Sequence, residues 1–158
     1  MGPEAGVEGR GGDRHLNTYA MAKAYIEDAE RSYREAELSL NERAFHRCIR
    51  RAQECVKLSL KGMLRLLGVE YPKSHDVSLA LERAREEVGM PDWLRDEVED
   101  LKRISMDLAM KRGPAFYGDE RAFIPPESLY SEEDAIEALE MALRTLKAAK
   151  RLLEAYER

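Results

Sequence analysis

Basic side chains recur at helical spacing along one stretch of the sequence, where a single acid, Glu54, interrupts them. These basic residues are Arg47, Arg50, Arg51, Lys57, Lys61 and Arg65. The whole chain carries a net charge of −5, so this local excess of positive charge indicates a site that binds an anion or a phosphate. The alternative interpretation is a solvated face, or a face paired with acids of neighbouring helices such as Glu27, Asp28 and Glu99.

Metal binding and nucleophilic catalysis have little support in the sequence. The three histidines, His15, His46 and His75, fall in a tail, a helix and a turn, and no His or Cys pair has structural-zinc spacing. No nucleophile elbow and no glycine-rich phosphate loop precedes a predicted helix. We therefore expect no metal and no cofactor. A Ser–His–acid triad stays open, since the chain contains all three residue types.

The elements that would position these residues belong to one domain. A chain of 158 residues suits a single domain with its own core. No apolar run approaches the roughly 18–20 residues that span a bilayer, so we expect a soluble protein. Five of the ten glycines fall within residues 1–13. We predict a flexible glycine-rich tail at residues 1–14 and one helical domain at residues 15–158.

The two cysteines and the start of the chain indicate the compartment. Cys48 and Cys55 are seven residues apart in one predicted helix, about 10 Å along its axis, too far for a disulfide within it. We interpret them as buried thiols of a cytoplasmic protein, since the start of the chain has no apolar segment of a signal peptide. Eighteen arginines and 8 lysines beside one glutamine and two asparagines are typical of a heat-adapted protein.

Apolar residues after the tail recur every three or four positions, which predicts helices and no strands. The first helix runs from about Asn17 to Leu40. Asn41 is expected to cap a second helix, which Gly68 ends. A short third helix is expected at about 76–88, closed by Gly89. The architecture predicted is all-α, an antiparallel up-and-down bundle of four or five helices.

Two further helices complete the predicted bundle. Pro91 opens the fourth, and Gly113-Pro114 should stop it. Ser131 and Asp134 approximate a capping box for the last helix. Its inward line is predicted to be Ile136, Leu139, Leu143, Leu146, Leu153 and Tyr156. Between these helices, residues 111–130 form an aromatic connection of about 20 residues, a length that often has a function in a compact domain.

The stretch CVKLSLKGML at residues 55–64, followed by Gly68 and by PKSHDV at 72–77, resembles the signature of HEPN domains. The family pattern is a helix with paired lysines, a short turn, and a His-Asp or His-Asn that opens the third helix. Lys57, Lys61, His75 and Asp76 match it, and the resemblance covers roughly residues 18–157. It implies an up-and-down bundle that is commonly a homodimer. Many such domains are ribonucleases of toxin and defence systems, and others bind nucleotides or act with a separate minimal nucleotidyltransferase.

The resemblance also implies a test for nuclease activity. The family's nuclease motif is an arginine followed four to six residues later by histidine, where the penultimate helix meets the last. The one match, Arg10 to His15, lies in the tail, and a pair of this kind is expected by chance. At the expected place the chain has Arg112, and a tyrosine, Tyr117, stands where the motif would have its histidine. A tyrosine of pKa about 10 is a poor base at neutral pH, whereas a histidine near 6.5 exchanges a proton readily.

The leading functional hypothesis is therefore a non-catalytic HEPN-type module that binds nucleotide or RNA phosphates, with a nucleotidyltransferase partner in a toxin–antitoxin or defence system. The alternatives are a toxin-type ribonuclease with a displaced base and a ligand-free dimeric adaptor. The predicted binding residues are Lys57, Lys61, Lys73, His75, Arg112 and Tyr117.

Each predicted residue has a chemical reason. Lys57 and Lys61 are four apart and can converge on one anion. Lys73 precedes the start of the third helix, where free N–H groups favour anions. Arg112 can fork onto a phosphate, and Tyr117 can stack on a base. His75 is interpreted as orienting the turn, or as a substitute base in the ribonuclease alternative.

Overall fold

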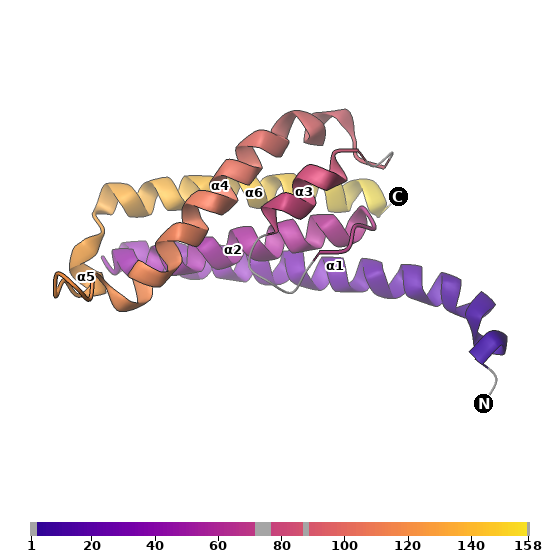
Figure 1. Cartoon of the computed structure of the whole chain (residues 1–158), viewed down its shortest axis with the longest axis horizontal. Helices are drawn as coiled ribbons and strands as arrows, with labels where there is room; N and C mark the ends of the chain where they lie inside the picture. Colours follow the sequence, from indigo (N-terminus) through magenta and orange to yellow (C-terminus); the bar gives the residue numbers. More distant parts are fainter. Residues whose placement is uncertain (1–2, 72–76, 87–88, 158) are drawn as a thin grey trace.

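A computed structural model describes the backbone of residues 3–71, 77–86 and 89–157, and the side chains of those ranges from residue 18 onward. Within these residues the chain forms six helices and no strand, apart from an isolated bridge between Asp119 and Ile124. Four long helices run alternately up and down, with α1, α2 and α6 nearly aligned and α4 crossing them obliquely (Figure 1). The all-α, up-and-down architecture predicted from periodicity is confirmed.

The first two helices form an antiparallel hairpin. α1 spans Pro3–Asn41 and α2 spans Phe45–Leu66. The N-cap of α2 is Ala44, without a side-chain hydrogen bond, so the prediction that Asn41 caps α2 is wrong. Asn41 instead belongs to α1, which ends in a Schellman turn: the amide of Ala44 donates to the Ser39 carbonyl, and Arg43 has a positive φ of 62°. Asn41 is therefore a helical residue of α1 and does not occupy the N-cap position of α2.

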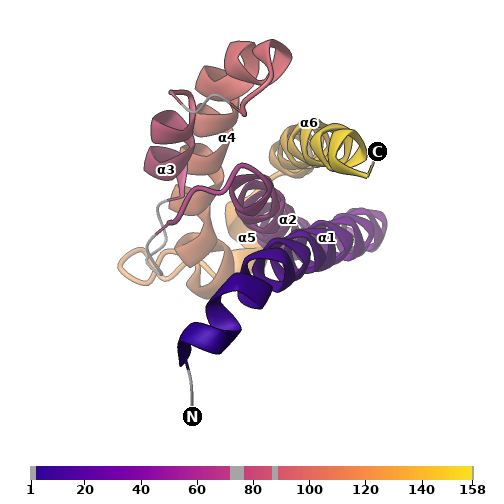
Figure 2. The same ribbon diagram turned by 90° about the vertical axis from the view of Figure 1, so that its right-hand side faces the viewer.

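α1 begins earlier than the sequence predicts. Its helical backbone starts at Pro3 rather than near Asn17, and the first turns project beyond the other helices (Figures 1 and 2). A helix that is already nucleated gains one hydrogen bond for each residue added and needs no new nucleus. The division into a tail at residues 1–14 and a domain at 15–158 stays a prediction.

α2 is the central helix of the bundle, packed against α1, α4 and α6. Its inward side carries Cys48, Ala52, Cys55, Ser59 and Met63, which are all buried, so the prediction that the two thiols are buried is confirmed. Gly68, at φ +72°, ends the helix as predicted, since the amide of Val69 donates to the Leu64 carbonyl.

α3 and α4 lie on one side of α2. α3 spans Ser78–Ala84, shorter than the predicted 76–88, whose ends lie outside the described residues. It tightens into a 3₁₀-type turn, where the amides of Arg85 and Glu86 donate to carbonyls three residues back. α4 spans Asp92–Tyr117 with Pro91 as its N-cap, and its inward residues Leu94, Val98, Leu101, Ile104 and Leu108 are buried.

Pro114 does not stop α4, so the predicted break at Gly113-Pro114 is wrong. Helical backbone before a proline is disfavoured by a clash with the preceding Cβ, and Gly113 has no Cβ. The helix continues until Gly118, whose amide donates to the Pro114 carbonyl and whose φ is +72°. The predicted connection of about 20 residues is correspondingly shorter, because residues 111–117 are helical and α5 spans Pro126–Leu129.

α6 spans Glu132–Tyr156 and begins with the predicted capping box of Ser131 and Asp134. Its inward face is only partly as predicted, because Ile136 is 40% and Tyr156 36% exposed. Alanines are buried in their place: Ala135, Ala138, Ala142 and Ala149. Small side chains let α6 approach α2 closely, and the thiols of Cys48 and Cys55 donate to the carbonyls of Ala135 and Ala142 at 3.6 and 3.9 Å.

The buried thiols give a direct test of this packing. Burial raises the pKa of Cys48 to about 11 and that of Cys55 to about 12. At about pH 8 both thiols are therefore protonated and inaccessible, and we expect a thiol-specific disulfide reagent to label neither in the folded protein. Both should react after unfolding in guanidinium. Rapid labelling of the native protein, followed by absorbance, would contradict the packing of α2 against α6.

Candidate functional site

The candidate site lies where α2 packs beside the C-terminal half of α4. Arg50, Lys57 and Lys61 follow one line along α2, because seven and four residues place them near the same helix angle. The line extends about 16 Å from Arg50 to Lys61 at 1.5 Å per residue. Arg112 joins it from α4.

The ring of Phe116 holds the arginines of the two helices together. The Cζ atom of Arg50 lies 3.6 Å from the centroid of that ring, and Cζ of Arg112 lies 5.1 Å from it. A guanidinium stacked on an aromatic face keeps its N–H groups available at its edge. Phe116 thus orders two arginines, for whose guanidinium groups the described part of the chain provides no ion-pair partner.

Lys57 and Lys61 carry their charge in a half-buried position. Burial lowers the pKa of Lys57, and the charges of Lys61 and Arg112 lower it further, against a smaller opposing effect of Glu54. The pKa of Arg50 is also lowered, first by burial and then by Arg47, Arg51 and Arg112. These cations repel one another, and a bound anion would relieve that repulsion.

Arg50, Lys57, Lys61 and Arg112 form a basic cluster, and no carboxylate of the described residues lies within ion-pair distance of it. Among the described side chains, the ion pairs involve none of Arg47, Arg50, Lys57, Lys61 and Arg112.

One basic residue of the α2 stretch does behave as an ordinary paired cation. Arg51 bridges to Glu54 at 2.9 Å and to Glu35 at 3.5 Å. Of the acids considered from the sequence as partners, Asp28 pairs with Arg31 and Glu99 pairs with Arg85. The alternative interpretation from the sequence, in which the basic residues pair with acids, therefore applies to Arg51.

The predicted site residues are only partly brought together. Lys57, Lys61 and Arg112 belong to one cluster, and Tyr117 lies at its edge with 69% of its surface exposed. The rings of Tyr117 and Phe116 are 5.9 Å apart, and the tyrosine opposes the lowering of the Arg50 pKa. Lys73 and His75 lie outside the described residues.

Sequence reasoning missed Phe116 and His46. Phe116 follows Arg112 by four residues, a spacing that places two side chains side by side on a helix, and this signal was available. His46 offered no such signal, because its neighbours come from the packing of α5 on α2. Its imidazole is half-buried, and its Nδ1 atom has no hydrogen-bond partner within the described structure.

His46 reports the electrostatics of the cluster. Burial lowers its pKa below 6.5, Arg50 and Arg47 lower it further, and Glu127 opposes them. We expect an NMR titration of the His46 ring to show a midpoint below 6.5. Because the folded pKa is lowered, the contribution of His46 to stability decreases as the pH falls through 6.5 toward that midpoint. A midpoint at or above 6.5 would contradict the placement of His46 beside these arginines.

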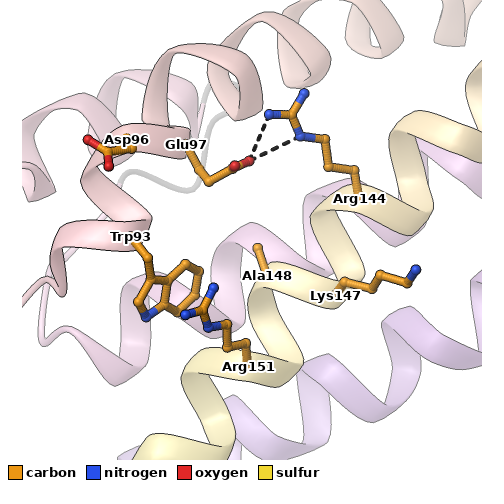
Figure 3. Close-up of a pocket in the computed structure, with 7 residues that line it drawn as sticks. All are labelled: Trp93, Asp96, Glu97, Arg144, Lys147, Ala148 and Arg151. Atoms are coloured by element: carbon orange, nitrogen blue, oxygen red, sulfur yellow. Dashed lines mark hydrogen bonds and ion pairs between the residues drawn. The ribbon is translucent and has the colours of Figure 1, made fainter.

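A cavity elsewhere in the bundle has a different character. It lies between α4 and α6, has a volume of about 420 Å³, and contains two acids, Asp96 and Glu97. Arg144 pairs with Glu97 at 2.9 Å, and Arg151 stacks over Trp93 at 4.2 Å (Figure 3). Lys147 points away from this pair. The carboxylates and diverging cations make this cavity less suited to a phosphate than the α2–α4 cluster.

The described residues contain neither a metal site nor a membrane span. No group of three or more His, Cys, Asp or Glu side chains there is arranged to hold a metal ion. None of the helices in that part of the chain is both long enough and apolar enough to cross a bilayer.

Two solved structures share this fold. The crystal structure of TT1696 from Thermus thermophilus matches with a TM-score of 0.63 and 24% identity, over 83% of this chain and 97% of that one. The crystal structure of ST0689, an archaeal HEPN homologue, matches with a TM-score of 0.58 and 23% identity, over 84% and 97% of the two chains. At these identities the likeness concerns the fold alone.

The sequence itself matches a family over most of its length. No curated protein matches the chain significantly. The family model of the HEPN domain, however, matches residues 22–155, which include α2, α4 and α6. The chain therefore belongs to the HEPN domain family.

Proposed function

We propose that the protein binds the phosphates of a nucleotide or of RNA at the cluster of Arg50, Lys57, Lys61 and Arg112. The observation that supports this proposal is a group of cations, two of them stacked on Phe116, with no carboxylate partner among the described side chains. Anion binding there would replace repulsion between like charges with attraction. Lys73, His75 and Tyr117 remain proposed contributors to the same site.

The direct test is binding of a fluorescein-labelled single-stranded oligouridylate, measured by fluorescence anisotropy. We expect binding that weakens steeply as salt rises, because phosphate contacts release counterions. Competition with ATP separates the two ligand classes: displacement at micromolar ATP would favour a nucleotide site, and failure to displace would favour an RNA site. No binding of either ligand at low salt would refute the proposal.

We propose that this binding occurs without metal-free cleavage of RNA. The chain has Tyr117 where the nuclease motif of the family would place a histidine. We expect incubation of a labelled RNA with the protein and EDTA to give no cleavage above background on a denaturing gel. The control is the same assay with a ribonuclease that needs no metal.

One observation favours the ribonuclease as a second candidate. His46 lies near enough to Arg50 and Arg47 for their charges to lower its pKa, which places an imidazole beside candidate phosphate ligands. Cleavage that is lost in His46→Ala or His75→Ala would establish this candidate and identify its base, and loss in Arg112→Ala would support the role of this arginine in holding the phosphate.

The partners and location remain proposals that follow from family membership. Domains of this family commonly dimerise, and we propose a homodimer that acts with a minimal nucleotidyltransferase in a toxin–antitoxin or defence system. We propose a cytoplasmic location, where Cys48 and Cys55 would remain free thiols, as they are in the structure.

A further inference from the structure

The cavity between α4 and α6 is bounded by two contacts between these helices, which differ in kind. At one end, Arg144 of α6 forms an ion pair with Glu97 of α4 at 2.9 Å. At the other end, the Cζ atom of Arg151 lies 4.2 Å from the centroid of the Trp93 ring. Figure 3 shows Ala148 between these two contacts. The cavity is therefore a recess of about 420 Å³ with a defined extent along the helices.

Helix periodicity places these residues together. Arg144, Ala148 and Arg151 are spaced by four and three residues, so they share one face of α6. Trp93 and Glu97 are four residues apart and share one face of α4. The Cα atoms of the two arginines are about 10 Å apart along the axis of α6, at 1.5 Å per residue. This spacing leaves room for a group of about the size of one aromatic ring, and the volume lies within the range of small-ligand sites.

The charges that line the cavity nearly cancel. The charged lining residues are the acids Asp96 and Glu97 and the bases Arg144, Lys147 and Arg151. Arg144 also bridges to Asp100 at 2.6 Å, which adds a third acid. An ion that entered would lose hydration without a net attraction from the surrounding charges. The cavity therefore favours a neutral ligand.

Two polar groups at the cavity keep hydrogen-bonding capacity. The Nε and Nη2 atoms of Arg144 both approach Oε2 of Glu97, at 3.0 and 2.9 Å, and no group of the described residues donates to its Oε1. Arg151 stacks on Trp93, and no carboxylate of the described residues lies within ion-pair distance of it. A stacked guanidinium keeps N–H groups available at its edge. The cavity thus offers an acceptor on α4 and donors on α6.

We propose that this cavity binds a phenol group, as in the side chain of tyrosine. The ring of the ligand packs beside Trp93 and over Ala148, which supply the apolar surface. A phenol hydroxyl is neutral at pH 7 and both donates and accepts a hydrogen bond. It can donate to Glu97 and accept from Arg151 at the same time. An ionised carboxylate only accepts and an ammonium group only donates, so each would satisfy one of the two groups.

Trp93 provides a reporter for the test, because it is the one tryptophan of the chain. The ligand tested is N-acetyl-tyrosinamide, with the emission of Trp93 excited where tyrosine does not absorb. We expect a saturable change in this emission and in the NMR resonance of the indole N–H, with a dissociation constant of about 1 mM. N-acetyl-phenylalaninamide lacks only the hydroxyl and should bind about fivefold more weakly. No saturable change, or equal affinity for the two analogues, would overturn the proposal.

A pair of variants locates the binding. Arg151→Ala removes the donor on α6 and should weaken binding of N-acetyl-tyrosinamide about fivefold, without loss of helical circular dichroism. The matched control is Lys150→Ala, which removes the same charge from the preceding residue, where the lysine bridges to Glu30 instead. This control should keep the wild-type affinity. The indole resonance gives the affinity of both variants, since loss of Arg151 alters the emission of Trp93 by itself. Equal weakening in both variants would overturn the assignment of the cavity.

A comparison with p-cresol, which is the tyrosine side chain without peptide groups, identifies the source of the phenol. Tighter binding of N-acetyl-tyrosinamide than of p-cresol would support a tyrosine in a peptide of a protein partner. Equal binding would support a free phenolic compound as the ligand of the same site. The proposal goes beyond phosphate binding and does not depend on it, so saturating oligouridylate should leave the affinity for N-acetyl-tyrosinamide unchanged. Competition between the two ligands would overturn the proposal of a separate site.

Discussion

Replacement of Gly62 with leucine is expected to destabilise the bundle strongly. A Cβ atom at this position would lie 2.6 Å from Cγ1 of Ile26 and 3.2 Å from the carbonyl oxygen of Ala22, both on α1. Real Cβ atoms do not approach other atoms to 2.6 Å, so α1 would have to move away from α2. Overpacking in a core costs about 1–3 kcal/mol for a few methylenes, and here it also separates two helices.

We expect the free energy of unfolding to fall by at least about 3 kcal/mol, out of a total of about 5–15 kcal/mol. Urea denaturation followed by circular dichroism measures this change. The matched control is Ala24→Leu, which adds a leucine to α1 at an exposed position and should change stability by less than about 0.5 kcal/mol. A Gly62→Leu protein as stable as the wild type would show that α1 and α2 do not approach as closely as described.

The second large effect is expected in ligand binding. The double variant Lys57→Ala, Lys61→Ala should bind oligouridylate about tenfold more weakly at low salt, which corresponds to about 1.4 kcal/mol. The slope of log affinity against log salt should flatten by about 1.4, because each lost phosphate contact of a single strand contributes about 0.7. The reason is that these two amines are half-buried beside Arg112, so that solvent screens them less than exposed lysines.

The control variant removes the same net charge elsewhere. Lys23→Ala, Lys147→Ala changes two exposed lysines on α1 and α6 and should reproduce the wild-type slope. If both double variants weaken binding equally, the net charge of the protein rather than the cluster governs affinity. If neither double variant weakens binding, the line of basic residues on α2 is a solvated face.

Much of the fold could be predicted because its signals are local. The buried line of α2, the glycine turn at Gly68 and the capping box of Ser131 and Asp134 each depend on residues within one or two helical turns. The errors occurred where a non-local contact or a neighbouring residue changed the local preference. Pro114 is tolerated in α4 because Gly113 precedes it, and the inward face of α6 follows the close approach of its alanines to α2.

The candidate site was predictable only as far as one helix determines it. The spacing of Lys57 and Lys61 places them together whatever α2 packs against. The association of Arg50 with Arg112 requires that α4 lie beside α2, and no single-helix pattern contains that information. The same holds for His46, whose environment includes Glu127 from α5. Helix pairing, rather than helix identity, is what the sequence reasoning lacked.

The measurement that tests the central claim most directly is the protection of individual lysines from acetylation by bound RNA. Acetic anhydride labels free amines, and the lowered pKa of Lys57 increases its reactive fraction. Mass spectrometry of peptides from the labelled protein, with and without saturating oligouridylate, gives the protection at each lysine. We predict strong protection of Lys57 and Lys61, and unchanged labelling of Lys147 and Lys150 on α6. Equal labelling of Lys57 and Lys61 with and without RNA, while Lys147 becomes protected, would contradict a phosphate site between α2 and α4.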